Sequence, residues 1–146
     1  MAFTLERDDG LILSGDPSRL DLDRICAWLA TAYWANTRDR VTIERSLTAS
    51  RPYGVYASDG TQIALARAVT DFAVIAWIGD VIVDPAWRGN GIGTWMMRAV
   101  VDDLVAHGVA RIMLATNDAH EVYQRVGFTA LRWPERWMEH NRSQLP

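Results

Sequence analysis

Apolar residues recur every three or four positions in several parts of the chain, a spacing that places them on one face of a helix. The clearest case is the helix predicted for residues 92–104. Its apolar face consists of Ile92, Met96, Ala99, Val100 and Leu104. The same spacing predicts a helix that Ser18 caps and whose inner face carries Leu22, Ile25, Cys26, Leu29 and Tyr33. Shorter helices are predicted for about residues 41–49 and 118–126.

Short apolar runs between turn signals predict strands. These runs are residues 11–14, 53–57, 62–69, 72–83, 111–115, 128–131 and 136–139. Asp59-Gly60 predicts a hairpin turn, and Gly79 is the natural place for a bulge in the long fourth run. The strand–helix–strand connection from residue 72 to 115 makes the fourth and fifth strands parallel neighbours. The order of elements predicts an α+β fold with a mixed sheet, in one domain covering residues 1–146.

The segment between the fourth strand and the helix at residue 92 has the composition of an anion site. Pro85 ends the strand, and three glycines at alternate positions lead directly into the helix. A helix start offers unpaired N–H groups and a partial positive charge, and Arg88 adds a guanidinium. We interpret this segment as a cradle for a pyrophosphate. The alternative is a tight connection without a ligand.

Two motifs in this chain resemble those of the GNAT superfamily of N-acetyltransferases. Residues 88–93, Arg-Gly-Asn-Gly-Ile-Gly, are similar to its acetyl-CoA signature Arg/Gln-x-x-Gly-x-Gly/Ala. Ala119, Tyr123, Gly127 and Phe128 match its Ala-x3-Tyr-x3-Gly-Phe pattern. The resemblance covers residues 72–146 well and the earlier part only in the order of elements. It implies a mostly antiparallel sheet of six to seven strands, flanked by about four helices and splayed between the fourth and fifth strands.

The resemblance also implies that acetyl-CoA is the co-substrate and that no metal takes part. The residues it assigns to acetyl-CoA are Val81, Ile82, Val83, Arg88, Gly89, Asn90, Gly91, Ile92, Gly93, Thr94, Thr116, Ala119 and Tyr123. The N–H of Val81 or Ile82 is expected to face the thioester carbonyl. Thr116 stands where many members have asparagine, so either Thr116 or Asn117 would contact the pantetheine.

Two residues are candidates for catalysis. Tyr123 matches the family tyrosine that protonates the coenzyme A thiolate, although its helical spacing also fits a core tyrosine. Asp80, beside the expected bulge, could bind a cationic amine or accept its proton. The alternative for Asp80 is a carboxylate that accepts backbone N–H bonds at the bulge. Tyr33 and Trp34 are expected either to line the acceptor pocket or to pack in the core or against a second subunit.

The amino-acid composition limits which binding partners and which cellular compartment are expected. The formal net charge is −3 without a block of basic residues, so a nucleic-acid partner is not expected. All basic residues other than histidine are arginines, because the sequence contains no lysine. The sequence has no apolar run long enough to span a membrane and no export signal, and its single cysteine fits a cytoplasmic protein. The family resemblance also implies a possible homodimer, for which Trp133, Trp137 and Met138 could supply the apolar surface.

The sequence therefore predicts an enzyme that transfers an acetyl group from acetyl-CoA to a primary amine of a small molecule or a protein. The alternative is a non-catalytic module that binds coenzyme A or acyl-CoA as a sensor.

Overall fold

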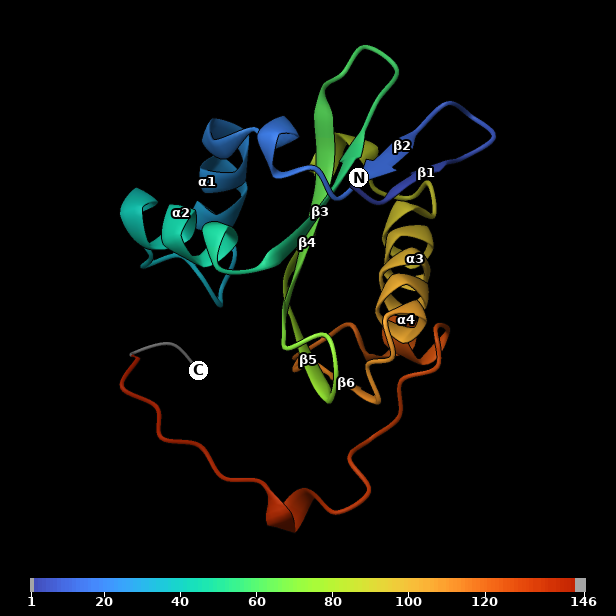
Figure 1. Ribbon diagram of the computed structural model, residues 1–146. Coiled ribbons are helices and arrows are strands. Elements are labelled where there is room, and N and C mark those ends of the chain that lie inside the picture. Colours follow the sequence, from blue (N-terminus) through green and yellow to red (C-terminus); the bar gives the residue numbers. More distant parts are fainter. Residues whose placement is uncertain (1, 144–146) are drawn as a thin grey trace.

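The computed structural model describes residues 2–143 and consists of one curled sheet with helices on both faces (Figure 1). The strands are β1 (Thr4–Glu6), β2 (Ile12–Ser14), β3 (Arg51–Tyr56), β4 (Gln62–Thr70), β5 (Ile75–Val83) and β6 (Arg111–Met113). The α-helices are α1 (Leu22–Ala30), α2 (Arg40–Thr48), α3 (Ile92–Ala106) and α4 (His120–Gln124). Short 3₁₀ turns occur at Pro17–Arg19, Pro85–Trp87 and Pro134–Arg136. None of the helices in residues 2–143 is long and apolar enough to cross a membrane.

The strands follow one another in the sheet in chain order, and all neighbours are antiparallel except β5 and β6. The parallel pairing of β5 with β6 runs from Ile75 opposite Arg111 to Trp77 opposite Met113. β5 then continues to Val83 without β6 beside it. We call the place where these two strands part the fork. The predicted α+β fold and its splayed strands are confirmed, with α3 as the crossover.

A bulge in β5 reverses the direction of its side chains. Arg67 in β4 lies opposite Gly79, but Leu65, two residues earlier, lies opposite Ile82, three residues later. The extra residue lets Asp80 adopt a left-handed backbone conformation (φ 53°), which aspartate tolerates better than most residues. The bulge expected near Gly79 is therefore confirmed, with Asp80 as its left-handed residue.

The side-chain reversal follows from the period of two in a strand. Ala76 and Ile78 belong to the core that α3 covers, and without a bulge residue 80 would face the same way. After the bulge, Val81 packs on that core, whereas Ile82 packs on the α1–α2 side. The bulge thus places Asp80 on the face that α1 and α2 cover.

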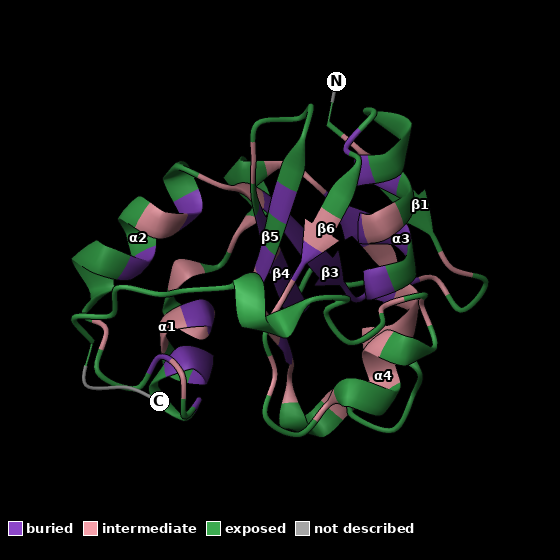
Figure 2. Cartoon of the chain, turned by 90° about the horizontal axis from the view of Figure 1, so that it is seen from below, coloured by how far each residue is buried: buried purple, intermediate pink, exposed green. Residues whose placement is uncertain are grey.

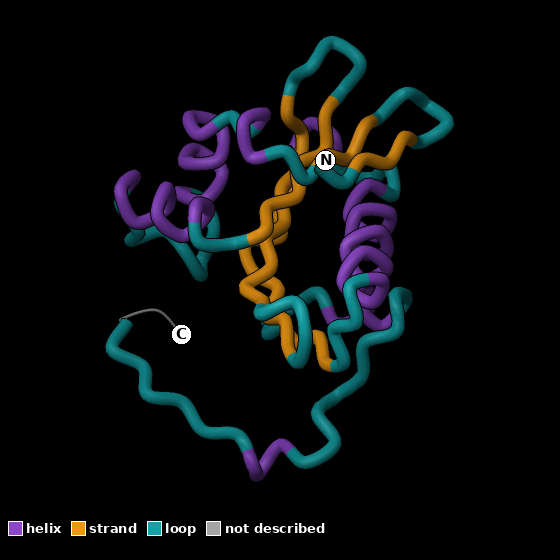
Figure 3. Tube along the Cα trace, in the orientation of Figure 1, coloured by secondary structure: helices purple, strands orange, loops and turns teal. Residues whose placement is uncertain are grey.

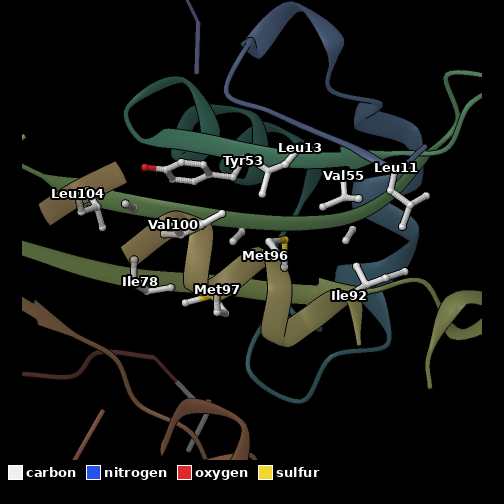
Figure 4. Close-up of a cluster of buried hydrophobic side chains, with 14 of the residues drawn as sticks. Leu11, Leu13, Tyr53, Val55, Ile78, Ile92, Met96, Met97, Val100 and Leu104 are labelled. Atoms are coloured by element: carbon white, nitrogen blue, oxygen red, sulfur yellow. The ribbon is translucent and has the colours of Figure 1, made fainter. Parts of the chain in front are cut away.

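The sheet separates two apolar cores (Figure 2). The larger core lies between α3 and the sheet and is shown in Figure 4. Met96, Met97, Val100 and Leu104 of α3 are fully buried there, which confirms the predicted helix face. The smaller core joins α1 and α2 to the opposite face of the sheet. Burial on both faces fixes the register of β4 against β5.

The start of the chain differs from the sequence prediction in two respects. β1 pairs with β2 although its side chains are exposed, so it lacks the apolar pattern that would have predicted it. The helix predicted from Ser18 begins at Leu22, because the carboxylate of Asp21 caps it by accepting a hydrogen bond from the N–H of Arg24. Pro17–Arg19 form a separate 3₁₀ turn, which Asp16 caps.

The strands predicted for residues 128–131 and 136–139 are wrong. Figure 3 shows the chain after α4 as a long loop with one short helical turn. Apolar residues form a strand only where a neighbouring backbone pairs with them, and no strand pairs with these segments in the described part of the chain. Trp133, Trp137 and Met138 are exposed, with Trp137 stacked on Arg111 at 4.7 Å. A homodimer through this surface stays a prediction.

Candidate active site

The start of α3 has the geometry of an anion site. Gly91 precedes the helix in a left-handed conformation (φ 69°), and no side chain caps the helix. The N–H of Trp95 makes the first intrahelical bond, to the carbonyl of Gly91, at 3.1 Å. The preceding N–H groups, from Ile92 to Thr94, have no hydrogen-bond partner among the described residues. These donors and the helix dipole favour a bound anion.

Side chains brace the loop that leads to this helix. Gly89 is left-handed (φ 83°), and the side-chain amide of Asn90 donates to the carbonyl of Trp87 at 2.9 Å. Arg88 donates through Nε to the carbonyl of Val83 at 3.1 Å. This bond leaves the two Nη groups of Arg88 available for a ligand. The structure thus brings the predicted cradle residues together, with the Asn90 side chain as a brace of the loop.

Arg7 also holds this loop, which the sequence did not indicate. Its Nη1 donates to the carbonyl of Asn90 at 3.0 Å, and its guanidinium lies 5.5 Å from the ring of Trp95. Arg7 lies in the turn between β1 and β2, 83 positions before Asn90. No spacing or motif in the sequence links residues so far apart.

Tyr33 connects the two sides of the fork. The backbone N–H of Asn117, after β6, donates to the hydroxyl of Tyr33 at 3.1 Å. Trp34 stacks edge-on against Tyr33, with ring centres 5.1 Å apart. Its indole N–H donates to Asp80 on β5 at 2.9 Å. The loop between α1 and α2 therefore touches β5 and the segment that follows β6.

Tyr123 of α4 lies close to this loop. Burial raises the pKa of Tyr123, and electrostatic interaction with the nearby Tyr33 and Asp118 adds to the effect. Its ring packs edge-on against Phe128, with centres 5.9 Å apart. Because its pKa is raised, the hydroxyl is protonated at neutral pH. It makes no hydrogen bond with another described residue, so it is free to donate one to a ligand.

Thr116 and Ala119 meet at the start of α4. The Thr116 hydroxyl accepts a hydrogen bond from the N–H of Ala119 at 3.1 Å. That hydroxyl can still donate to a ligand. The Asn117 N–H is used by Tyr33. Contacts of either residue with the pantetheine stay predictions.

Asp80 is surrounded by donors from other side chains rather than from the backbone. Oδ1 accepts from Trp34 and from Nη1 of Arg38, both at 2.9 Å. Oδ2 accepts from the same Nη1 at 2.9 Å and from Nε of Arg67 at 2.7 Å. Four contacts use the carboxylate's whole accepting capacity, so an amine cannot bind to it without displacing a donor.

The protonation of Asp80 follows from these partners. Burial by itself would raise its pKa, but the hydrogen bonds and positive charges of Arg67 and Arg38 outweigh burial and hold the pKa below its ordinary value. A carboxylate with a lowered pKa is a weak base. Asp80 therefore lies at the predicted place but without the properties of a general base.

The chain resembles known acetyltransferases in sequence. A model of the Acetyltransferase (GNAT) family matches residues 21–128. A histone acetyltransferase of Glycine max is 27% identical over 124 residues, which cover 80% of this chain and 54% of that protein. GCN5-related N-acetyltransferase 2, chloroplastic, of Arabidopsis thaliana is 38% identical over 69 residues, which cover 47% of this chain and 27% of that protein. The chain thus spans about half or less of the length of these relatives.

Solved structures have the same fold. A protein from Xanthomonas campestris pv. campestris assigned to the GNAT family has a TM-score of 0.84 and 36% identity, over 90% of this chain and 92% of that one. N-acetylglutamate synthase from Neisseria gonorrhoeae, solved with coenzyme A and N-acetyl-glutamate, has a TM-score of 0.70 over 84% of this chain and 29% of that one. At 18% identity, the second likeness is one of fold alone.

The surroundings of Asp80 predict a large effect of Asp80→Asn on stability. Asparagine also tolerates the left-handed conformation, so the substitution removes charge without straining the bulge. It leaves two mostly buried guanidiniums without a counter-ion, and we expect the free energy of unfolding at pH 7 to fall by roughly 2–3 kcal/mol. Urea unfolding followed by circular dichroism measures this change.

Asp23→Asn is the matched control, because Asp23 pairs with Arg40 at 2.7 Å with both side chains exposed. We expect it to lower the free energy of unfolding by less than about 1 kcal/mol, because the pair is exposed and Asp23 also lies in the first turn of α1. Since the pKa of Asp80 is lowered in the folded state, its contribution is present above the unfolded-state pKa of about 4 and is lost as the pH falls through the lower, folded-state value. Equal unfolding midpoints for Asp80→Asn and wild type at pH 7 would contradict this account.

Proposed function

The chain belongs to the GNAT family of acetyltransferases, and we propose that it transfers the acetyl group of acetyl-CoA to a primary amine by direct attack on the thioester. The single observation that carries this proposal is the uncapped, glycine-led start of α3 beside the fork. It supports binding of a pyrophosphate by the N–H groups of Ile92 to Thr94, with the Nη groups of Arg88 as additional donors.

The fork supports a place for the thioester. Beyond Trp77, the edge of β5 toward β6 has no strand partner among the described residues. The N–H of Val81 or Ile82 would then be the donor that stabilises the carbonyl oxygen as negative charge develops on it. Val83 and Gly93 lie next to each other at the base of α3, with 3.8 Å from the Val83 methyl to the position of a Cβ at Gly93. A side chain at Gly93 would therefore narrow the space at this end of the fork.

In the proposed reaction, the nitrogen of a neutral amine bonds to the carbonyl carbon as the carbon–sulfur bond breaks. The sulfur leaves with the electron pair, the amine loses one proton, and the thiolate gains one. Tyr123 donates that proton, a role supported by its match to the family tyrosine and by its hydroxyl, which is protonated at neutral pH and unbonded. Asp80 is fully bonded, so we assign the proton from the amine to solvent water and keep Asp80 as the residue that positions Arg38 and Arg67.

The names of the relatives include a histone acetyltransferase and an N-acetylglutamate synthase. Such acceptors differ widely, so the fold does not choose among them. A sensor that binds coenzyme A without turnover would need the cradle but not Tyr123. Removing the hydroxyl of Tyr123 therefore distinguishes an enzyme, which would lose activity, from a sensor, which would not be affected.

We expect Tyr123→Phe to lower kcat with an accepted amine on the order of 100-fold, the usual contribution of a general acid. The dissociation constant of coenzyme A should change less than about twofold, because the phosphates bind at α3. Stopped-time thiol release gives kcat, and calorimetry gives the affinity.

Tyr56→Phe is the matched control, since the Tyr56 hydroxyl is buried and has no hydrogen-bond partner in the described chain. Its removal should leave kcat unchanged. An unchanged kcat in Tyr123→Phe would remove the acid role. Binding of acetyl-CoA by the wild type without acetylation of any amine would favour the sensor.

The cradle can be tested with two equivalent glycines. Gly91→Ala and Gly60→Ala both place a side chain on a left-handed residue with open space around it, a strain of about 1–2 kcal/mol. Only Gly91 shapes the start of α3. We expect Gly91→Ala to weaken coenzyme A binding by roughly tenfold, as measured by calorimetry, and Gly60→Ala to lower stability while binding stays the same. Equal affinities for the two variants would contradict the cradle.

A further inference from the structure

An excess of positive charge lies on the α1–α2 face of the sheet, beside the fork. Arg38 and Arg67 share one carboxylate, that of Asp80, and neither pairs with another acidic side chain in residues 2–143. The side chains of Arg38 and Arg67 are 25% and 14% exposed, and that of Asp80 is 2% exposed. One uncompensated charge in such a buried place is costly. A bound anion would neutralise it.

The two guanidiniums also have donors to spare. Arg38 binds Asp80 through Nη1 alone. Arg67 uses Nε for Asp80 and Nη1 for the hydroxyl of Ser50 at 2.9 Å. The Nη2 groups of both arginines make no hydrogen bond with another described residue. Planar N–H groups of this kind are suited to a carboxylate.

Gly79 keeps the Arg67 guanidinium accessible. It lies opposite Arg67 in the sheet, and a Cβ on Gly79 would stand 3.7 Å from Nη2 of Arg67. The missing side chain therefore leaves the guanidinium uncovered on this side. Gly79 comes two residues after Trp77, where β5 leaves β6. The spare donor thus lies where an acceptor would enter the fork.

A chain of contacts joins this charge to the reacting centre. Asp80 accepts a hydrogen bond from Trp34, which stacks on Tyr33, and the Tyr33 hydroxyl accepts one from the N–H of Asn117, just before α4. The arginines and the two aromatic rings therefore form a wall that extends from the α1–α2 face to the segment leading into α4, the helix that carries Tyr123. A small acceptor on this wall can bind the arginines at one end while its amine reaches the fork.

We propose that the acceptor is a small molecule that carries a carboxylate together with its primary amine, such as a free amino acid, and that Arg38 and Arg67 bind this carboxylate. The inference rests on the proposed acetyl transfer and adds the class of acceptor. Polyamines and lysine-rich peptides are disfavoured acceptors, because the excess charge repels them.

The experiment compares amino acids with their primary amides as acceptors, using acetyl-CoA and thiol release. Each pair has nearly the same size but differs by the carboxylate charge, and each rate is corrected to the neutral-amine fraction at the assay pH. We expect kcat/KM of the acid to exceed that of its amide at least about tenfold for the preferred side chain. In Arg67→Met this ratio should fall toward one.

Arg40→Met is the control for a general change in charge, because Arg40 is an exposed arginine of α2 that pairs with Asp23. It should leave the acid-to-amide ratio unchanged. The ratio compares two substrates of the same variant, so partial loss of folded protein does not affect it. A ratio that is the same in Arg67→Met and wild type would overturn the assignment of the carboxylate to Arg67.

A binding measurement separates this inference from the proposed function. Calorimetric titration of the complex with coenzyme A compares N-acetyl amino acids with N-acetyl amino acid amides. Tighter binding of the N-acetyl amino acids than of their amides, with the difference lost in Arg67→Met, would support the carboxylate site. If no amine were acetylated in the same study, that finding would contradict the transfer reaction but not the carboxylate site. Acetylation of amides, spermidine or a lysine-rich peptide in preference to every acid would overturn the acceptor class while the transfer reaction stands.

Discussion

The organisation of this protein depends on one additional residue in β5. A strand alternates its side chains between two faces, and the bulge at Asp80 changes which residues face which core. Before it, Ala76 and Ile78 pack under α3; after it, Ile82 packs under α1 and α2. The same strand also leaves β6 just before the bulge. One local irregularity therefore coincides with the opening of the sheet and turns a carboxylate toward the face that α1 and α2 cover.

Two arginines stabilise the bulge at Asp80. A buried aspartate in a left-handed conformation is unfavourable unless its charge is compensated. Arg67, from the neighbouring strand, and Arg38, from the loop between α1 and α2, provide that compensation. The ion pairs join three separate elements at the point where β5 and β6 part. Structure and chemistry are thus linked: the groups that stabilise the bulge also set the charge of the proposed acceptor site.

The sequence predicted the parts of the site that are local. The glycine-led helix start with its unpaired N–H groups and the bulge beside Gly79 both depend on neighbouring residues, so their patterns could be read directly. The partners of Asp80 could not be read, because Arg67 and Arg38 lie 13 and 42 positions away and come together only through folding. The same reason explains the two wrong strands after residue 127. Their apolar residues fit a strand, but the pattern does not reveal whether another backbone lies alongside.

The hydrogen bond from Arg7 to the carbonyl of Asn90 affects where the N-terminal boundary of this domain should be drawn. The family match begins at residue 21, after β1 and β2. A fragment trimmed to that boundary would keep every residue of both acetyl-CoA motifs and lose the outer support of the loop that precedes α3. The segment that the family model matches is therefore smaller than the folded unit, and the turn between β1 and β2 supports the loop to which we assign the pyrophosphate.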